Sequence, residues 1–235
     1  MGTSIFIKTW KNDLQWLKYC RDSIRKYCSG FDEIVIASDA GCADAVRVFC
    51  PDARVESVKE WGNGYIQQQW VKLCADKLIN GEQILFVDSD CIFHTPFTPE
   101  DFMKDGKPIL LKILYSELAK CPLGSKALHW RKVTEDVVKW NVEWEYMRRC
   151  PMMFLSSTVR ETREMFPWLE EYLRQLKSQK FSEFNVLGAV VENIEPENYS
   201  IIDAHDYLPP CPAKQFRSWD GISHEIQLEI EGFLK

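Results

Sequence analysis

The chain has 235 residues, of which 46% are hydrophobic and 27% charged, a composition typical of one folded globular domain rather than of a disordered chain. Its formal net charge of −6 argues against a protein that binds nucleic acid over its whole surface. Because no apolar run is long enough to span a membrane and residues 1–10 do not resemble a signal peptide, the sequence predicts a cytoplasmic protein.

Short β-branched segments alternate with helical patterns over residues 1–90, which is typical of a parallel sheet flanked by helices. Strands are predicted at 4–8, 33–37, 54–58 and 84–87, and helices at 42–49, at 65–79 and between an N-cap at Asn12 or Asp13 and Gly30. The strand at 84–87 is continuously apolar, as expected for a strand that is buried on both faces. The sequence therefore predicts an α/β fold with a doubly wound, mostly parallel sheet in a single domain.

The pattern becomes less regular after Pro96. Strands are predicted at 109–113 and 152–155, and the sequence from Trp130 to Tyr146 has a helical pattern. A capping-box pattern at 158–161 predicts the start of a further helix, which Pro167 interrupts. This half of the chain therefore predicts both strands and helices, in a looser order than the first half.

Two carboxylates, Asp88 and Asp90, directly follow the buried strand at 84–87. In open α/β sheets, ligands bind beyond the carboxyl ends of the strands, which is where this pair lies. Two neighbouring carboxylates repel each other and suit a hard divalent cation such as Mg²⁺ or Mn²⁺. Such a cation can bridge a diphosphate and neutralise its charge as it leaves, so the pair predicts a metal and diphosphate site.

The segment 84–93, ILFVDSDCIF, is preceded by 64–73, GYIQQQWVKL. Together they resemble the donor half of DxD-containing glycosyltransferases of the GT-A type, above all small bacterial and phage members. The resemblance covers about residues 4–96. It implies a single GT-A domain over 1–235, with a donor half at about 1–96 and an acceptor half at about 97–235. It also implies a metal-dependent enzyme that takes a sugar from a nucleotide-sugar, with a UDP-sugar as the first expectation.

Three further residues match positions that bind the donor in this family. Thr9 follows the first strand and Asp39 follows the second, where such enzymes contact the nucleoside. Both are also ordinary turn residues at strand ends. Lys72 lies on a helix face distinct from the apolar face, from which it can reach a donor phosphate. The alternative for Lys72 is a solvated side chain without a role in binding.

Two later residues complete the site that the resemblance implies. Glu183 lies in a segment similar to the acidic element near the acceptor or the anomeric carbon. It is expected to act as a general base in an inverting reaction or to orient groups in a retaining one. The alternative is that Ser182 caps a helix with Glu183 in its first turn. His224 resembles the late histidine that joins Asp88 and Asp90 at the metal in some GT-A families, although a lone histidine is often structural.

The acceptor is the least determined part of this interpretation. A saccharide, a lipid-linked glycan, a protein or a hydroxymethylated DNA base is compatible with the sequence. Residues 116–181 are net positive, which keeps DNA open as an acceptor, although solvated helix faces explain this charge equally well. Arg148 and Arg149 precede an apolar strand and are candidates for contacting a phosphate.

Three other functions compete with a glycosyltransferase. Phosphatases of the haloacid dehalogenase type also carry two aspartates at a strand end, but normally on the first strand and with Thr or Val where Ile92 stands here. Nucleotidyltransferases usually have a glycine-rich, basic loop after the first strand, and residues 9–13 do not form one. A non-catalytic binding module that keeps the metal also remains open.

Overall fold

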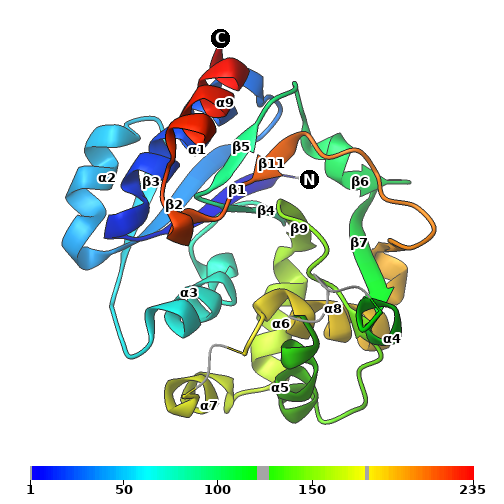
Figure 1. Ribbon diagram of the computed structural model, residues 1–235. Coiled ribbons are helices and arrows are strands. Elements are labelled where there is room, and N and C mark those ends of the chain that lie inside the picture. Colours follow the sequence, from blue (N-terminus) through cyan, green and yellow to red (C-terminus); the bar gives the residue numbers. More distant parts are fainter. Residues whose placement is uncertain (1, 121–126, 178–179) are drawn as a thin grey trace.

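A five-stranded sheet with the strand order β3-β2-β1-β4-β9 forms the centre of the fold (Figure 1). The computed structural model describes residues 2–120, 127–177 and 180–235. Four strands are parallel and the fifth, β9, is antiparallel to β4. The bounds are β1 (Thr3–Thr9), β2 (Glu33–Asp39), β3 (Arg54–Val58), β4 (Gln83–Asp88) and β9 (Met152–Leu155). The predicted α/β domain with a mostly parallel sheet flanked by helices is confirmed.

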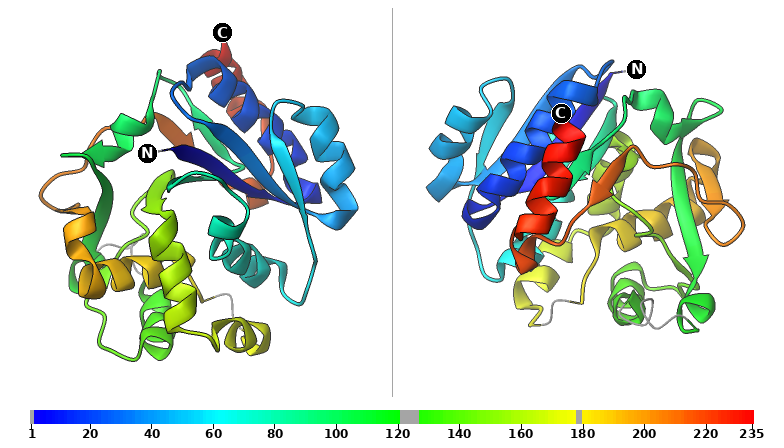
Figure 2. Two further views of the ribbon diagram at one scale, coloured as in Figure 1. Left: turned by 180° about the vertical axis from the view of Figure 1, so that it is seen from behind. Right: turned by 45° about the horizontal axis from the view of Figure 1, so that its top comes forward.

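One face of this sheet packs against the N-terminal and C-terminal helices. The elements here are α1 (Leu14–Tyr27), α2 (Ala43–Phe49), α9 (His224–Leu234) and a small antiparallel pair, β5 (Cys91–Phe93) with β11 (Ala213–Gln215). Ile5 and Val87 from the strands share one buried cluster with Leu17 of α1 and Ile230 of α9. Helices α1 and α9 therefore lie side by side although they come from opposite ends of the chain (Figure 2).

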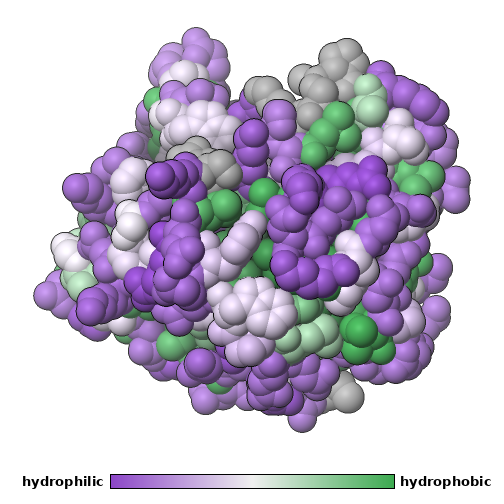
Figure 3. Space-filling model, turned by 90° about the horizontal axis from the view of Figure 1, so that it is seen from below, coloured by the Kyte–Doolittle hydropathy of each residue, from purple (hydrophilic) through white to green (hydrophobic). Residues whose placement is uncertain are grey.

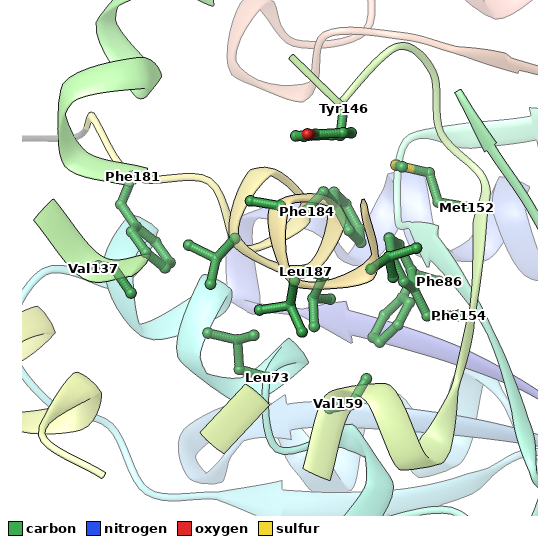
Figure 4. Packing of buried hydrophobic residues seen from close by; sticks show 14 of the residues in the cluster. Leu73, Phe86, Val137, Tyr146, Met152, Phe154, Val159, Phe181, Phe184 and Leu187 are labelled. Carbon is green, nitrogen blue, oxygen red and sulfur yellow. The ribbon is translucent and has the colours of Figure 1, made fainter. Parts of the chain in front are cut away.

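The other face of the sheet packs against an aromatic core around α8 (Figure 4). The helices here are α3 (Gly64–Lys72), α5 (Leu128–Val138), α6 (Ser156–Met165) and α8 (Glu183–Ile194). The Phe86 ring lies edge-on to Phe184 of α8, with 5.6 Å between the ring centroids. Tyr146 lies so close to α8 that a Cβ added at Gly188 would be 2.2 Å from its ring, so only glycine fits there. Alternate residues of β1 and β4 thus face two separate cores, as the period of a strand requires.

A second sheet, in the order β10-β7-β6 with β8 beside β7, flanks this core. The bounds of its strands are β6 (Met103–Lys104), β7 (Lys107–Leu114), β8 (Trp144–Glu145) and β10 (Ser200–Asp203). The remaining helices are α4 (Tyr115–Leu118) and α7 (Leu169–Gln175), with short 3-10 helices at 11–13, 40–42, 75–77, 99–102, 196–198 and 218–220.

The face that carries α5 and α7 is mostly hydrophilic (Figure 3). No helix in the described part of the chain is long and apolar enough to cross a membrane.

The structure confirms most of the elements predicted for residues 1–96 and corrects several others. The helix predicted at 65–79 ends at Lys72, and only a short 3-10 turn follows at 75–77. The helical pattern predicted up to Tyr146 is wrong beyond Val138, because Lys139 adopts a left-handed conformation with φ 67° and a strand follows.

The capping box predicted at 158–161 is also wrong. Thr158 lies inside α6, and its buried hydroxyl is 2.7 Å from that of Tyr199. The predicted break at Pro167 is confirmed, since α6 ends at Met165 and α7 begins at Leu169. The Thr158 hydroxyl thus pairs with a residue far along the chain, and a local pattern does not show such a partner.

Candidate active site

The carboxyl ends of three parallel strands bring the predicted donor residues to one edge of the main sheet. Thr9 ends β1, Asp39 ends β2 and Asp88 ends β4. In the registers of these strands, Lys8 of β1 lies opposite Asp88, and Thr9 lies opposite Ser38 of β2. The fold therefore places Thr9, Asp39 and Asp88 at the end of the sheet where ligands of such sheets bind.

Each of the carboxylates of Asp88 and Asp90 has one oxygen with its own donor and one oxygen that shares a donor with the other carboxylate. Asp88 Oδ1 accepts a hydrogen bond from Lys72 Nζ at 2.6 Å, and Asp90 Oδ2 accepts one from the backbone N–H of Ser218 at 3.1 Å. The other two oxygens share a single donor. Gln215 Nε2 is 2.9 Å from Asp88 Oδ2 and 3.3 Å from Asp90 Oδ1. Two carboxylate oxygens thus converge on one point at the edge of the sheet.

The surroundings of Asp90 disfavour the negative charge of its carboxylate. It is 6% exposed, and burial together with repulsion from Asp88 raises its pKa from 3.8 to about 7. Burial also raises the pKa of Asp13, which accepts a hydrogen bond from Ser89 Oγ at 3.1 Å. A divalent cation between Asp88 and Asp90 would relieve this repulsion, and carboxylate oxygens are the ligands that Mg²⁺ and Mn²⁺ prefer. The residues present therefore fit such a cation.

The described residues contain no group of three or more His, Cys, Asp or Glu side chains that could hold a metal ion. Among these residues, Asp88 and Asp90 are the acidic pair of the candidate metal site. His224 begins α9 and is exposed, after Ser223, whose side chain caps that helix. No hydrogen bond in the described part of the chain joins His224 to Asp88 or Asp90, and its role at the metal stays a prediction.

Lys72 is buried between two carboxylates. Its Nζ is 2.6 Å from Asp88 Oδ1 and 2.9 Å from Glu183 Oε1, and its side chain is 3% exposed. Burial by itself would lower the pKa of Lys72, but the charges of Asp88 and Glu183 outweigh it and hold the pKa well above its usual value. The interpretation of Lys72 as a solvated side chain is therefore wrong. Its contact with a donor phosphate stays a prediction.

Glu183 begins α8 and is 1% exposed. Ser182 is the N-cap of this helix, as predicted, since its hydroxyl accepts a hydrogen bond from the Asn185 N–H. The backbone N–H of Glu183 donates to Gln69 Oε1 at 3.2 Å, which joins α8 to α3. Burial raises the pKa of the Glu183 carboxyl, although Lys72 acts in the opposite direction. Glu183 thus connects to Asp88 through Lys72, and its catalytic role stays a prediction.

Three residues of this edge were not predicted as site residues. Lys8 is buried, and its Nζ is 2.7 Å from Asp39 Oδ1, so a charged residue in an otherwise apolar strand was the available signal. Asp13 was predicted only as a helix cap, yet its side chain makes no capping hydrogen bond and contacts Ser89 instead. Gln215 gave no signal, because its neighbours in sequence are unrelated to the Asp88 segment.

The fold and this edge together define an α/β protein with a mostly parallel sheet and paired carboxylates at its carboxyl edge. By its sequence the chain belongs to the family of unknown function DUF6492, which it matches over residues 15–184. A comparison with curated proteins gives no match.

Among solved structures, the chain is similar to the apo-form glycosyltransferase GlyE of Streptococcus pneumoniae TIGR4, with a TM-score of 0.54 and 10% sequence identity. The similarity covers 100% of this chain and 60% of that protein, so the chain spans about three fifths of its length. Another structure of GlyE from the same organism has a TM-score of 0.46 and 9% identity, and the match covers 86% of this chain and 45% of that one.

Proposed function

We propose that this protein is a metal-dependent glycosyltransferase that transfers a sugar from a nucleotide-sugar donor to a saccharide acceptor. The observation that carries this proposal is the convergence of Asp88 Oδ2 and Asp90 Oδ1 on one point at the carboxyl edge of the sheet. The raised pKa of Asp90 supports it, because the pair lacks the positive charge that a divalent cation would supply. The glycosyltransferase-like fold supports the reaction class.

Asp88 and Asp90 would hold Mn²⁺ or Mg²⁺, and the bound cation would neutralise the diphosphate as it leaves. Lys72 holds one oxygen of Asp88, and the other contacts the Gln215 amide, which also contacts Asp90. We assign the nucleoside to the ends of β1 and β2. The Thr9 hydroxyl there is buried and has no hydrogen-bond partner among the described residues, and Asp39 is oriented by its ion pair with Lys8.

Glu183 is the proposed catalytic carboxylate. Burial raises the pKa of its carboxyl above the usual value, and a higher pKa makes a carboxylate a stronger base. Its ion pair with Lys72 connects it to Asp88 at the donor site. In an inverting reaction it would accept the proton of the acceptor hydroxyl, and in a retaining reaction it would orient the reacting groups.

The surface charges favour a saccharide over DNA as the acceptor. Many basic side chains of residues 116–181 pair with acidic neighbours, and Arg148 pairs with Glu145. Further pairs are Lys120–Glu117, Arg131–Glu135, Lys132–Asp136, Arg163–Asp76 and Arg174–Glu170. Residues 121–126 and 178–179 of this region lie outside the described part. We expect no salt-dependent retention of duplex DNA at low salt, and tight retention would restore a hydroxymethylated base as acceptor.

The competing enzymes find less support in the structure. Asp88 ends β4 and not the first strand, where phosphatases of the haloacid dehalogenase type carry their aspartate pair. Residues 11–13 form a 3-10 turn without a glycine, unlike the phosphate loop of nucleotidyltransferases. Both alternatives also use paired carboxylates, so the position of the pair at the end of β4 and the missing glycine loop are the observations that favour a glycosyltransferase.

The experiment that tests the proposal measures the reaction class directly. The purified protein would be incubated with UDP-, GDP- and TDP-sugars and Mn²⁺ in the absence of an acceptor, and the released nucleoside diphosphate would be measured. One donor should be hydrolysed well above the others, and a chelator should stop the reaction. Release of inorganic phosphate from phosphomonoesters, or no donor hydrolysis and no donor binding, would overturn the proposal.

A further inference from the structure

We propose that Gln215 is a ligand of the divalent cation, supplying its side-chain amide oxygen as the third protein oxygen beside Asp88 and Asp90. This inference rests on the proposed function, because it concerns the cation of that same site. It assigns to β11 a role that the sequence analysis gave to His224.

The position of the Gln215 amide is the first argument. Its Nε2 lies 2.9 Å from Asp88 Oδ2 and 3.3 Å from Asp90 Oδ1, so the amide bridges the two oxygens that would face a cation. Two carboxylates prefer an N–H group to an amide oxygen at this point, because only the N–H group can donate hydrogen bonds to them. A cation there would repel the N–H group. A half-turn of the amide exchanges nitrogen and oxygen with almost no change in shape, and it would direct Oε1 toward the cation.

The backbone around Gln215 is the second argument, because it keeps the side chain at the site. Gln215 of β11 lies opposite Cys91 of β5 in an antiparallel pair. The Phe216 N–H donates to the Asp90 carbonyl oxygen at 2.9 Å, and the Ser218 N–H donates to the Asp90 carboxylate at 3.1 Å. The Phe216 ring also packs against Trp16, with 5.7 Å between the centroids. The strand is therefore held beside Asp90, and rotation of the amide is the smallest movement that admits a cation.

The ligand requirement of the cation is the third argument. Mg²⁺ and Mn²⁺ favour about six oxygen ligands, among which amide carbonyls of Gln and Asn are suitable. The described residues contain no third acidic or histidine side chain grouped with Asp88 and Asp90 as a metal ligand set. Gln215 is the neutral oxygen-bearing side chain that already contacts both carboxylates. It is thus placed to complete the protein part of the site.

The test is the affinity of the protein for Mn²⁺ alone, measured by titration calorimetry without donor. Gln215→Met keeps the length of the side chain and removes the oxygen, and it should weaken Mn²⁺ binding by about tenfold or more. Gln215→Glu keeps an oxygen at the same reach and should bind Mn²⁺ at least as tightly as the wild type. The matched control is Gln175→Met on the exposed face of α7, which should bind Mn²⁺ like the wild type.

The outcomes separate this inference from the proposed function. If Gln215→Met binds Mn²⁺ as well as or better than the wild type while Asp90→Asn loses binding, the inference is overturned and the metal site at Asp88 and Asp90 stands. If the wild type binds no Mn²⁺, or if Asp90→Asn binds it normally, both fail. Thermal unfolding followed by circular dichroism would confirm that each variant is folded. Should Gln215→Met not fold, weaker Mn²⁺ binding by Gln215→Glu than by the wild type would overturn the inference.

Discussion

Two groups bridge carboxylates at the edge of the main sheet, and they differ in charge. In the inner region, the Lys72 ammonium group lies between Asp88 and Glu183 and is buried. In the outer region, the neutral amide of Gln215 lies between Asp88 and Asp90. The inner pair of carboxylates therefore shares one full positive charge from the protein, whereas the outer pair shares only a neutral amide. Asp88 belongs to both regions.

This difference separates stability from binding. The Lys72 ammonium group fills the space between Asp88 and Glu183 and leaves no room there for a metal ion. Its removal would leave uncompensated charge inside the protein. The repulsion between Asp88 and Asp90 instead lowers the stability of the folded protein, and a cation from solution can remove this repulsion. The raised pKa of Asp90 reflects its burial and this repulsion. We expect changes in the inner region to affect folding most and changes in the outer region to affect metal binding most.

Removing the inner cation should have the largest effect. Lys72→Met leaves Asp88 and Glu183 buried beside each other without an ammonium group, and the free energy of unfolding should fall by about 3–5 kcal/mol. Urea unfolding would measure this change. The matched control is Lys18→Met on α1, whose ion pair with Asp22 is largely exposed and should matter far less. Equal losses in the two variants would remove the distinction between inner and outer regions.

Neutralising the inner carboxylate should affect turnover. If Glu183 is the general base, Glu183→Gln should reduce kcat by about 10² or more, with donor affinity little changed. The amide keeps the size of the side chain and can still contact Lys72. Steady-state kinetics and donor titration of the same variant would measure the two quantities. A wild-type kcat would leave Glu183 with only its structural roles, the start of α8 and the ion pair with Lys72.

The outer region should make stability depend on pH in the absence of metal. The pKa of Asp90 is raised from 3.8 to about 7 in the folded protein, so between these values the folded state binds more protons than the unfolded state. The contribution of Asp90 to stability is therefore lost as the pH rises toward 7. The stability gained by Asp90→Asn relative to the wild type should therefore grow as the pH rises from about 4 to about 7, as measured by urea unfolding. A difference that does not change with pH would contradict this account of Asp90.

Part of this edge was predictable because Asp88 and Asp90 lie at the end of a regular strand. Alternating strands and helices over residues 1–96 gave the parallel sheet, and the apolar run before Asp88 placed the carboxylates at its carboxyl edge. In such a sheet the carboxyl ends of parallel strands lie at the same edge, independently of the conformation of the loops. For this reason Thr9, Asp39 and Asp88 were brought to one edge from sequence alone.

The partners of these residues were not predictable, because they come from distant segments. Gln215 follows Asp88 by more than a hundred residues and reaches it only through the pairing of β11 with β5. Lys72 was assigned to a helix face but not to a buried ion pair, since its second partner, Glu183, lies on α8. Local periodicity indicates which face a residue occupies, and it does not indicate which distant element covers that face.

The central claim is that the outer region is a metal and diphosphate site, and anomalous diffraction from crystals grown with Mn²⁺ and UDP tests it most directly. The account predicts an anomalous peak beside Asp88 and Asp90, with the diphosphate of UDP in contact with it and the nucleoside toward the ends of β1 and β2. A peak at another place, or UDP bound away from the carboxyl edge of the main sheet, would contradict it.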